Sequence, residues 1–264
     1  RNGPLPVKIA LWQTTPRHTI TEALEALKNT TAQAAKNGAE LLVTPEMFIG
    51  GYNIGEAQVH RHAMQSDSVI EKLHGITITY KTALIVGMAN NSDQSPTNSC
   101  IAINAAGKIL GKYDKTHLFG DVDRQQFIAG TQLSKVITLN GWRISLAICY
   151  DVEFPEVVRA FALSGTDLVV IPTANMTPFD SVATRLVPAR AEENAVYMAY
   201  CNYVGREGEF SYNGLSCICG PDGNDITRGD AQNESLSYAN LDHTILAAVR
   251  RTQTHLRDRR QDLY

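Results

Sequence analysis

The sequence lacks the features that mark several large classes of protein. No apolar run approaches the roughly 18 residues of a membrane-spanning helix, and the longest, such as 168–171, have the length of a strand. A surplus of positive charge is also missing, because 24 Lys and Arg residues face 27 Asp and Glu residues and the net charge is -3. We therefore expect neither a membrane nor a nucleic acid as a partner.

Residues 1–6 contain no apolar segment of the signal-peptide type. Cysteine is scarce, and the 264 residues contain five: Cys100, Cys149, Cys201, Cys217 and Cys219. An odd number leaves at least one thiol unpaired, and a chain of this length does not depend on disulfides. Both observations predict a reducing, cytoplasmic location.

No linker rich in Ser, Gly or Pro divides the chain, and no short repeat is present. The composition, with 44% hydrophobic and 19% charged residues, is that of a globular protein. Strand-like and helix-like segments alternate in both halves, with hairpin signals between some of the strands. We expect one α/β domain over residues 1–264, with mixed sheets and helices on their faces.

Three segments have the apolar periodicity of a helix, over 19–36, about 56–75 and 180–194. Gly38 follows the first segment and is expected to end that helix. Pro188 falls inside the third segment, where it is expected to kink or bound the helix because proline has no amide hydrogen.

Polar residues follow three of the predicted strands at the point where each strand ends. Strand 40–44 leads to Glu46, strand 142–148 to Cys149, and strand 167–171 to Asn175. Open α/β sheets place their ligands beyond the carboxyl ends of the strands. These ends are therefore the first place to look for chemistry.

Cys149 stands between a buried-looking strand and a helix that begins near Pro155. A cysteine at such a turn is exposed yet rigidly held, as in a nucleophile elbow. The alternative is a small buried side chain, which is the usual role of a free cysteine. A nucleophilic thiol also needs a base, and His117 is the histidine nearest to it in sequence, so a Cys–His site is one hypothesis.

Several segments together carry a family resemblance. The main motifs are TPEMF at 44–48, YDKTHLF at 113–119 and ICYDVEFPE at 148–156, with FIAG at 127–130, RAEEN at 190–194 and GPDG at 220–223 in support. In this order and spacing they resemble the nitrilase superfamily of carbon–nitrogen hydrolases. The resemblance spans nearly the whole chain.

The resemblance implies a four-layer αββα sandwich and a homodimer or larger assembly. It also implies a catalytic triad of Glu46 as general base, Lys115 as oxyanion stabiliser and Cys149 as nucleophile, with no cofactor and no metal. Many members carry a second glutamate, and here that position is Asp123, one methylene shorter. Asp123 is a candidate auxiliary residue that orients substrate or Lys115, or else an exposed loop residue.

Two positions indicate the branch of the family. Nitrile-converting members usually have Trp-Glu after the nucleophile, whereas this chain has Tyr150 and Asp151, which favours amide hydrolysis. Several amidases and carbamoylases that act on carboxylate substrates carry a basic residue four positions after the cysteine, where this chain has Glu153. We hypothesise that Glu153 disfavours an anionic substrate and favours a neutral or amine-bearing amide. The alternative is an ordinary acidic residue in the first turn of a helix.

Tyr52, Tyr150 and Asn175 each lie beside a motif at the end of a predicted strand, and together with Glu153 they are the candidate substrate-binding residues. The alternative for Tyr52 is a residue that closes the loop at 50–53. Cys217 and Cys219 alternate along a strand, so their side chains point to one face. No further ligand at metal-binding spacing is evident, and we expect no metal there.

The sequence therefore predicts a cofactor-free cysteine amidase that hydrolyses a small primary amide to a carboxylic acid and ammonia through a thioester. Within enzymes, the alternatives are an N-carbamoyl amide hydrolase and a nitrilase. From a different class, the alternative is a catalytically silent family member that acts as a binding protein.

Overall fold

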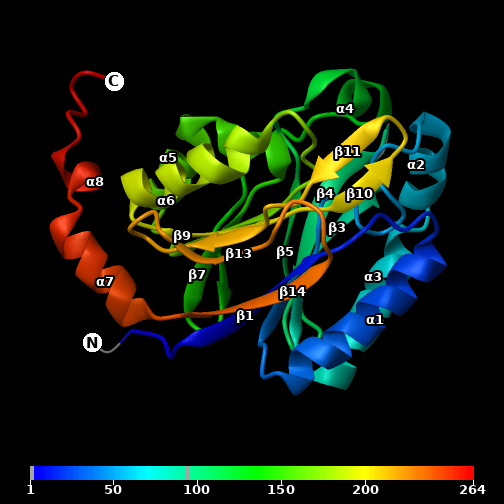
Figure 1. The fold of residues 1–264 in the computed structure, drawn as a ribbon, viewed down its shortest axis with the longest axis horizontal. Coiled ribbons are helices and arrows are strands. Elements are labelled where there is room, and N and C mark those ends of the chain that lie inside the picture. Colours follow the sequence, from blue (N-terminus) through cyan, green and yellow to red (C-terminus); the bar gives the residue numbers. More distant parts are fainter. Residues whose placement is uncertain (1–2, 93–94) are drawn as a thin grey trace.

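The computed structural model describes residues 3–92 and 95–264. Residues 1–2 of the N-terminal segment, for which no signal peptide is expected, lie outside the described residues. Its two large sheets have six strands each (Figure 1). In order across the first sheet, the strands are β14 (Ser235–Leu241), β1 (Val7–Gln13), β2 (Leu41–Val43), β3 (Ala83–Asn90), β4 (Thr97–Ile103) and β5 (Ile109–Asp114). In order across the second, they are β13 (Asp225–Arg228), β12 (Cys217–Cys219), β9 (Tyr197–Cys201), β8 (Leu168–Pro172), β7 (Trp142–Leu146) and β6 (Ile137–Leu139).

Both sheets are mixed in the same way. The pairs β1–β2 and β2–β3 are parallel in the first sheet, as are β7–β8 and β8–β9 in the second. The outer strands of each sheet pair antiparallel to this parallel centre. The carboxyl ends of three central strands therefore meet at one edge of each sheet.

Helices cover the outer face of each sheet (Figure 1). The helices α1 (Ile20–Lys36) and α3 (Ser66–Tyr80) lie on the first sheet, and α5 (Pro155–Leu163) and α6 (Val187–Asn194) lie on the second. The remaining helices are α2 (Glu56–Ala63), α4 (Gly120–Gln126), α7 (His243–Thr252) and α8 (His255–Asp258). The predicted αββα sandwich is confirmed.

Strand β1 shows how the alternation of side chains builds these layers. Ile9 and Leu11 point into the core between the two sheets, where they pack with side chains of the second sheet such as Ile144 and Leu168. Ala10 and Trp12 point the other way, into the core beneath α1 and α3. Consecutive strand residues face opposite sides, so one strand contributes to two cores.

The structure corrects two of the predicted helices. The segment expected over 56–75 forms two helices, α2 and α3, and Gln65 between them has non-helical torsions. The segment expected over 180–194 begins as a π-helix, η2 (Val182–Leu186), and becomes the α-helix α6 at Val187. Pro188 lies in the first turn of α6, and its missing amide hydrogen explains why the preceding turn is wider.

Two short strands, β10 (Val204–Glu207) and β11 (Phe210–Asn213), form a separate hairpin that the sequence analysis missed. Their turn has no Asn-Gly or Asp-Gly signal, and Gly208 supplies its positive φ of 58°. None of the helices within residues 3–92 and 95–264 has the length and apolar character needed to cross a membrane.

Candidate active site

The predicted triad residues follow strands of both sheets. Glu46 follows β2 and Lys115 follows β5 of the first sheet, whereas Cys149 follows β7 of the second. The amide of Glu46 donates to the carbonyl of Thr173 after β8, at 3.2 Å, which ties the two sheets together at this point. The site thus lies between the sheets, at the carboxyl edge of their parallel strands.

The turn that carries Glu46 depends on close backbone contact with β3. Met47 has a φ of 50°, and a Cβ atom on Gly87 would lie 2.5 Å from both the Met47 nitrogen and the Pro45 oxygen. Only glycine leaves room for this approach. The Tyr203 hydroxyl also contacts this turn and donates to the Glu46 carbonyl at 2.7 Å.

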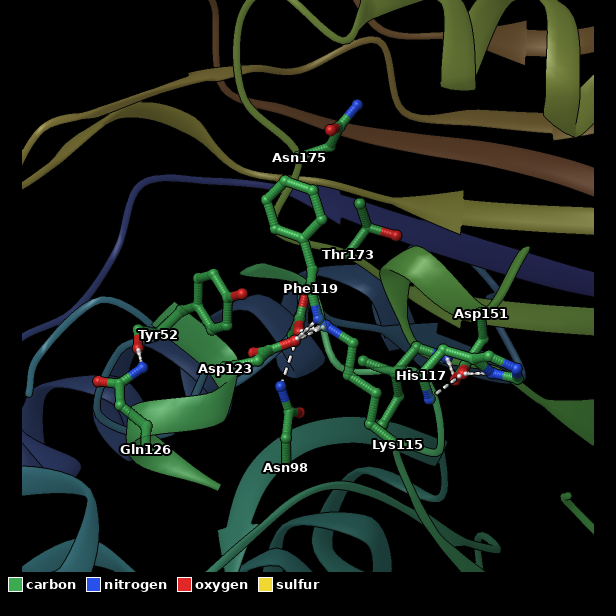
Figure 2. A network of polar contacts seen from close by, with 12 residues as sticks. Tyr52, Asn98, Lys115, His117, Phe119, Asp123, Gln126, Asp151, Thr173 and Asn175 are labelled. Atoms are coloured by element: carbon green, nitrogen blue, oxygen red, sulfur yellow. Dashed lines mark hydrogen bonds and ion pairs between the residues drawn. The ribbon is translucent and has the colours of Figure 1, made fainter. Parts of the chain in front are cut away.

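Lys115 lies between two carboxylates (Figure 2). Its Nζ is 2.8 Å from Glu46 Oε1 and 2.6 Å from Asp123 Oδ2, and all three side chains are fully buried. Asp123 Oδ2 also accepts from the Phe119 amide at 2.7 Å. Asp123 is therefore a buried residue of α4 in contact with Lys115, not an exposed loop residue, and its auxiliary role stays a prediction.

The carboxylate oxygens of Glu46 are in different environments. Oε1 accepts from Lys115 and also from Asn98 Nδ2 at 2.7 Å. Oε2 is buried and makes no hydrogen bond with any residue that the structure describes. Burial raises the pKa of Glu46 above 4.5, and the negative charge of Asp123 raises it further. The positive charge of Lys115 acts in the opposite direction but does not cancel this shift. Oε2 is thus a free, basic acceptor inside the site.

The charge of this cluster is unbalanced. Burial alone would lower the pKa of Lys115, but the carboxylates of Asp123 and Glu46 outweigh it and hold that pKa well above its ordinary range. One ammonium therefore faces two carboxylates, and with both ionised one negative charge remains. That charge favours uptake of a proton.

Cys149 is half-buried and begins the 3₁₀ helix η1 (Cys149–Glu153) with a φ of 45°. This left-handed conformation is uncommon for a residue with a side chain, and it matches the predicted nucleophile elbow. Burial and the charge of Glu46 raise the pKa of the Cys149 thiol, against the opposing effects of Lys115 and the Ala174 amide. The resting group is a thiol, so it needs a base to become a nucleophile.

Asp151 connects this elbow to the loop that carries Lys115 (Figure 2). One oxygen accepts from the Ile148 amide at 2.9 Å and from the Tyr113 hydroxyl at 2.7 Å. The other accepts from the His117 amide at 3.0 Å and lies 2.8 Å from His117 Nδ1. The side chain of Asp151 is completely buried.

His117 is therefore part of a structural network. Its ring stacks on Phe154, with centroids 4.2 Å apart, and across residues 3–92 and 95–264 it makes no hydrogen bond to Cys149. This arrangement speaks against the Cys–His hypothesis and leaves Glu46 as the candidate base.

A cavity of about 210 Å³ opens above Cys149. Its lining consists of Phe119, Cys149, Tyr150, Glu153, Ala174, Asn175, Met176 and Phe179. It contains three of the four predicted substrate-binding residues, whose contact with substrate stays a prediction. A larger cavity of about 500 Å³ at the β5 edge lies along residues 110–114 and 131–137 and contains none of the triad.

Tyr52, the fourth predicted residue, lies behind the triad rather than in the lining of this cavity. It is 1% exposed, and its ring centre is 5.7 Å from Lys115 Nζ. Glu207 of the β10–β11 hairpin accepts from the Tyr52 and Asn53 amides, at 3.2 and 2.7 Å, and from the Tyr212 hydroxyl at 2.6 Å. No local pattern in the sequence indicates this contact, so Glu207 was not among the predicted site residues.

The fold also brings a third potential metal ligand to Cys217 and Cys219. The two sulfur atoms and an Asp225 oxygen lie within 4.8 Å of one another. Asp225 comes from β13, which the sequence analysis did not predict. Both of its carboxylate oxygens are bonded to Arg228, at 2.6 and 2.7 Å, so an ion would have to compete with this pair.

Comparisons with known proteins identify the family of the chain. The sequence model of the carbon-nitrogen hydrolase family matches residues 8–251. The "Hydrolase in pqqF 5'region" of Pseudomonas protegens is 39% identical, over all of this chain and 92% of that protein. An (R)-stereoselective amidase of Pseudomonas sp. is 32% identical, over 84% of this chain and 80% of that protein.

Solved structures give the same result. An amidase from Nesterenkonia sp. has a TM-score of 0.89 and 32% identity, and the match covers 100% of this chain and 96% of that chain. A mutant of that amidase in complex with butyramide matches with a TM-score of 0.88 and 32% identity, over 97% of this chain and 95% of that chain.

Together, the fold and the comparisons define an enzyme class, the hydrolases of carbon–nitrogen bonds other than peptide bonds. The chain belongs to the carbon-nitrogen hydrolase family, within the nitrilase superfamily. The predictions of family and enzyme class are confirmed.

Proposed function

We propose that the protein hydrolyses a small primary amide to a carboxylic acid and ammonia, with Cys149 as nucleophile, Glu46 as base and Lys115 as oxyanion stabiliser. One observation carries the proposal. Glu46 has a buried, unbonded carboxylate oxygen within a cluster that holds one ammonium and two carboxylates. Such a group is suited to accept a thiol proton at the moment of attack.

The acylation half-reaction follows from these positions. Glu46 takes the proton of Cys149 as the sulfur forms a bond to the amide carbon. The carbonyl oxygen becomes negative, and the fixed charge of Lys115 stabilises it. As the carbon–nitrogen bond breaks, Glu46 returns the proton to the leaving nitrogen, and ammonia departs from a thioester.

The second half-reaction regenerates the thiol. Glu46 takes a proton from water, whose oxygen attacks the thioester carbon. The carbon–sulfur bond breaks, the carboxylic acid leaves, and the proton returns to Cys149. These steps need no cofactor. The amidase neighbour that binds butyramide supports a small amide as substrate, and the 210 Å³ cavity is below the range typical of drug-sized ligands.

Ammonia release from a panel of small amides tests the proposal. We expect Cys149→Ala to abolish release, and Lys115→Ala and Glu46→Gln each to lower kcat by about 10²-fold or more. Cys100→Ala removes a buried thiol outside the site and serves as the matched control. Intact mass spectrometry should detect an acyl adduct on Cys149 during turnover.

The same assay separates the alternatives. Turnover of nitriles or N-carbamoyl compounds in place of amides would replace this proposal by the nitrilase or carbamoylase function. A Lys115→Ala variant with full activity would contradict the assigned roles. Binding of amides without any turnover would indicate a silent binding protein.

A further inference from the structure

The cavity above Cys149 contains a charged group that the proposed chemistry does not use. Glu153 stands at the end of η1, four residues after the nucleophile, and lines the cavity. Its side chain is partly buried, and burial raises its pKa against the opposing charges of Lys115 and Arg190. Among the residues that the structure describes, none forms a hydrogen bond or ion pair with its carboxylate.

The two cations that act on Glu153 are committed elsewhere. Lys115 is held between Glu46 and Asp123. Arg190 donates to the backbone carbonyls of Val152 and Glu153, at 3.1 and 2.9 Å, and its third nitrogen lies 3.2 Å from Glu193. Arg190 thus fixes the backbone of η1 and leaves the Glu153 carboxylate without a partner.

Aromatic rings form much of the remaining wall. Phe119, Tyr150 and Phe179 all line the cavity, and the ring of Phe119 lies 5.3 Å from that of Tyr150 and 5.8 Å from that of Phe179. Aromatic faces attract cations, and a partly desolvated carboxylate without a partner is costly until a cation joins it. This combination of groups suits an ammonium ion.

We propose that the substrate is a small primary amide with a protonated amine, whose ammonium group pairs with the Glu153 carboxylate while its amide carbon lies against Cys149. This inference rests on the proposed function and adds the substrate class. An anionic amide would face the repulsion of Glu153 in the same cavity. The cavity of about 210 Å³ restricts the substrate to a short chain between amine and amide.

Matched substrates test the class. Each ω-amino amide, from glycinamide to 5-aminopentanamide, is compared with the alkyl amide of equal length and with the monoamide of a dicarboxylic acid. The best amino amide should exceed its neutral partner in kcat/KM by about 10- to 100-fold, the range expected for a charged hydrogen bond. Equal values, or a preference for the anionic monoamide, would overturn the proposal.

Glu153→Gln keeps the size of the side chain and removes its charge. We expect the ratio of kcat/KM between the amino amide and the alkyl amide to fall by about 10- to 100-fold. Glu156→Gln is the matched control, because Glu156 is an exposed acid in the first turn of α5 outside the cavity, and it should leave this ratio unchanged. An unchanged ratio in Glu153→Gln would assign Glu153 to an ordinary helix-terminal role.

Binding separates this proposal from the proposed function. Titration calorimetry with the Cys149→Ala protein measures affinity for 4-aminobutanamide and pentanamide in the absence of turnover. A preference for the amino amide that disappears on adding Glu153→Gln supports the inference even if no amide is hydrolysed. Ammonia release with no such preference would overturn this inference and leave the proposed function intact.

Discussion

In the proposed mechanism, the ionisation of Glu46 sets how activity depends on pH. As a base it must be ionised, and burial raises its pKa above 4.5. Since a carboxyl with a raised pKa takes up its proton at higher pH, kcat/KM for a neutral amide should fall with decreasing pH around a midpoint above 4.5. The thiol of Cys149 has a pKa raised well above 9.0, so we expect no loss of activity on the alkaline side below pH 9.

A control is needed because the pKa of Glu153 is also raised. The pH profile of Glu153→Gln with butyramide should keep the acidic midpoint of the wild type. A midpoint that moves with this substitution would assign the titration to Glu153, and activity that stays constant down to pH 4.5 would exclude Glu46 as the base.

At the scale of the elements, strand β3 fixes the position of the turn that carries Glu46. Gly87→Ala would force a Cβ atom to within 2.5 Å of the turn at Pro45–Met47, and the turn would have to shift together with Glu46. We expect a lower Tm and a fall in kcat of about 10²-fold, the scale of an active-site misplacement of about 1 Å. Activity assays and thermal unfolding of the purified variant provide the measurement.

Gly75→Ala is the matched control. Gly75 lies within α3, and apart from its chain neighbours and the nearby backbone of that helix, no atom of the residues that the structure describes is within 4 Å of the position of an added Cβ. Alanine in a helix interior is favoured over glycine by about 1 kcal/mol, so this variant should be at least as stable as the wild type and fully active. A fully active Gly87→Ala enzyme would show that the turn does not depend on this contact.

Local patterns in the sequence predicted the elements that end at the site. The strands before Glu46 and Cys149 and the turn at Cys149 are readable because strand periodicity and the proline at 155 act over a few residues. The motif comparison added Lys115 and Asp123. The contacts of Asn98 with Glu46 and of Glu207 with Tyr52 join residues 52 and 155 positions apart, and no local pattern encodes such pairs.

The same reason explains the elements that were wrong or missed. The strands β10, β11 and β13 have four residues each, which is too few for a clear period. The long helix expected over 56–75 keeps its apolar spacing across the break at Gln65, so periodicity alone does not reveal that break. Asp225 lies beside Cys217 and Cys219 because β12 pairs with β13, and this pairing is not visible in the local sequence.

At the scale of the whole molecule, the two sheets share one core. Ile9, Leu41 and Ile85 of the first sheet pack in the same cluster as Ile144 and Leu168 of the second. We propose on this basis that residues 1–264 form the single domain expected from the sequence. The homodimer or larger assembly, which light scattering on the purified protein would measure, stays a prediction, as does the cytoplasmic location.

The two tryptophans make the single-domain proposal testable. Trp12 lies on β1 of the first sheet and Trp142 on β7 of the second, and both are buried. The variants Trp142→Phe and Trp12→Phe each keep one reporter. If the sheets unfold together, then in each variant tryptophan fluorescence and far-ultraviolet circular dichroism should give the same denaturant midpoint. Separate midpoints for the two signals within one variant would divide the chain into two domains.

The burial of Cys149 beside Glu46 has a consequence beyond turnover. Peroxides and other oxidants attack thiolates far faster than thiols, and here the environment keeps the sulfur protonated at rest. In the proposed mechanism the sulfur becomes reactive only while Glu46 takes up its proton, so we expect the idle protein to be oxidised more slowly than a hydrolase that holds its cysteine as a thiolate. Idle molecules should survive oxidative stress with their nucleophile intact.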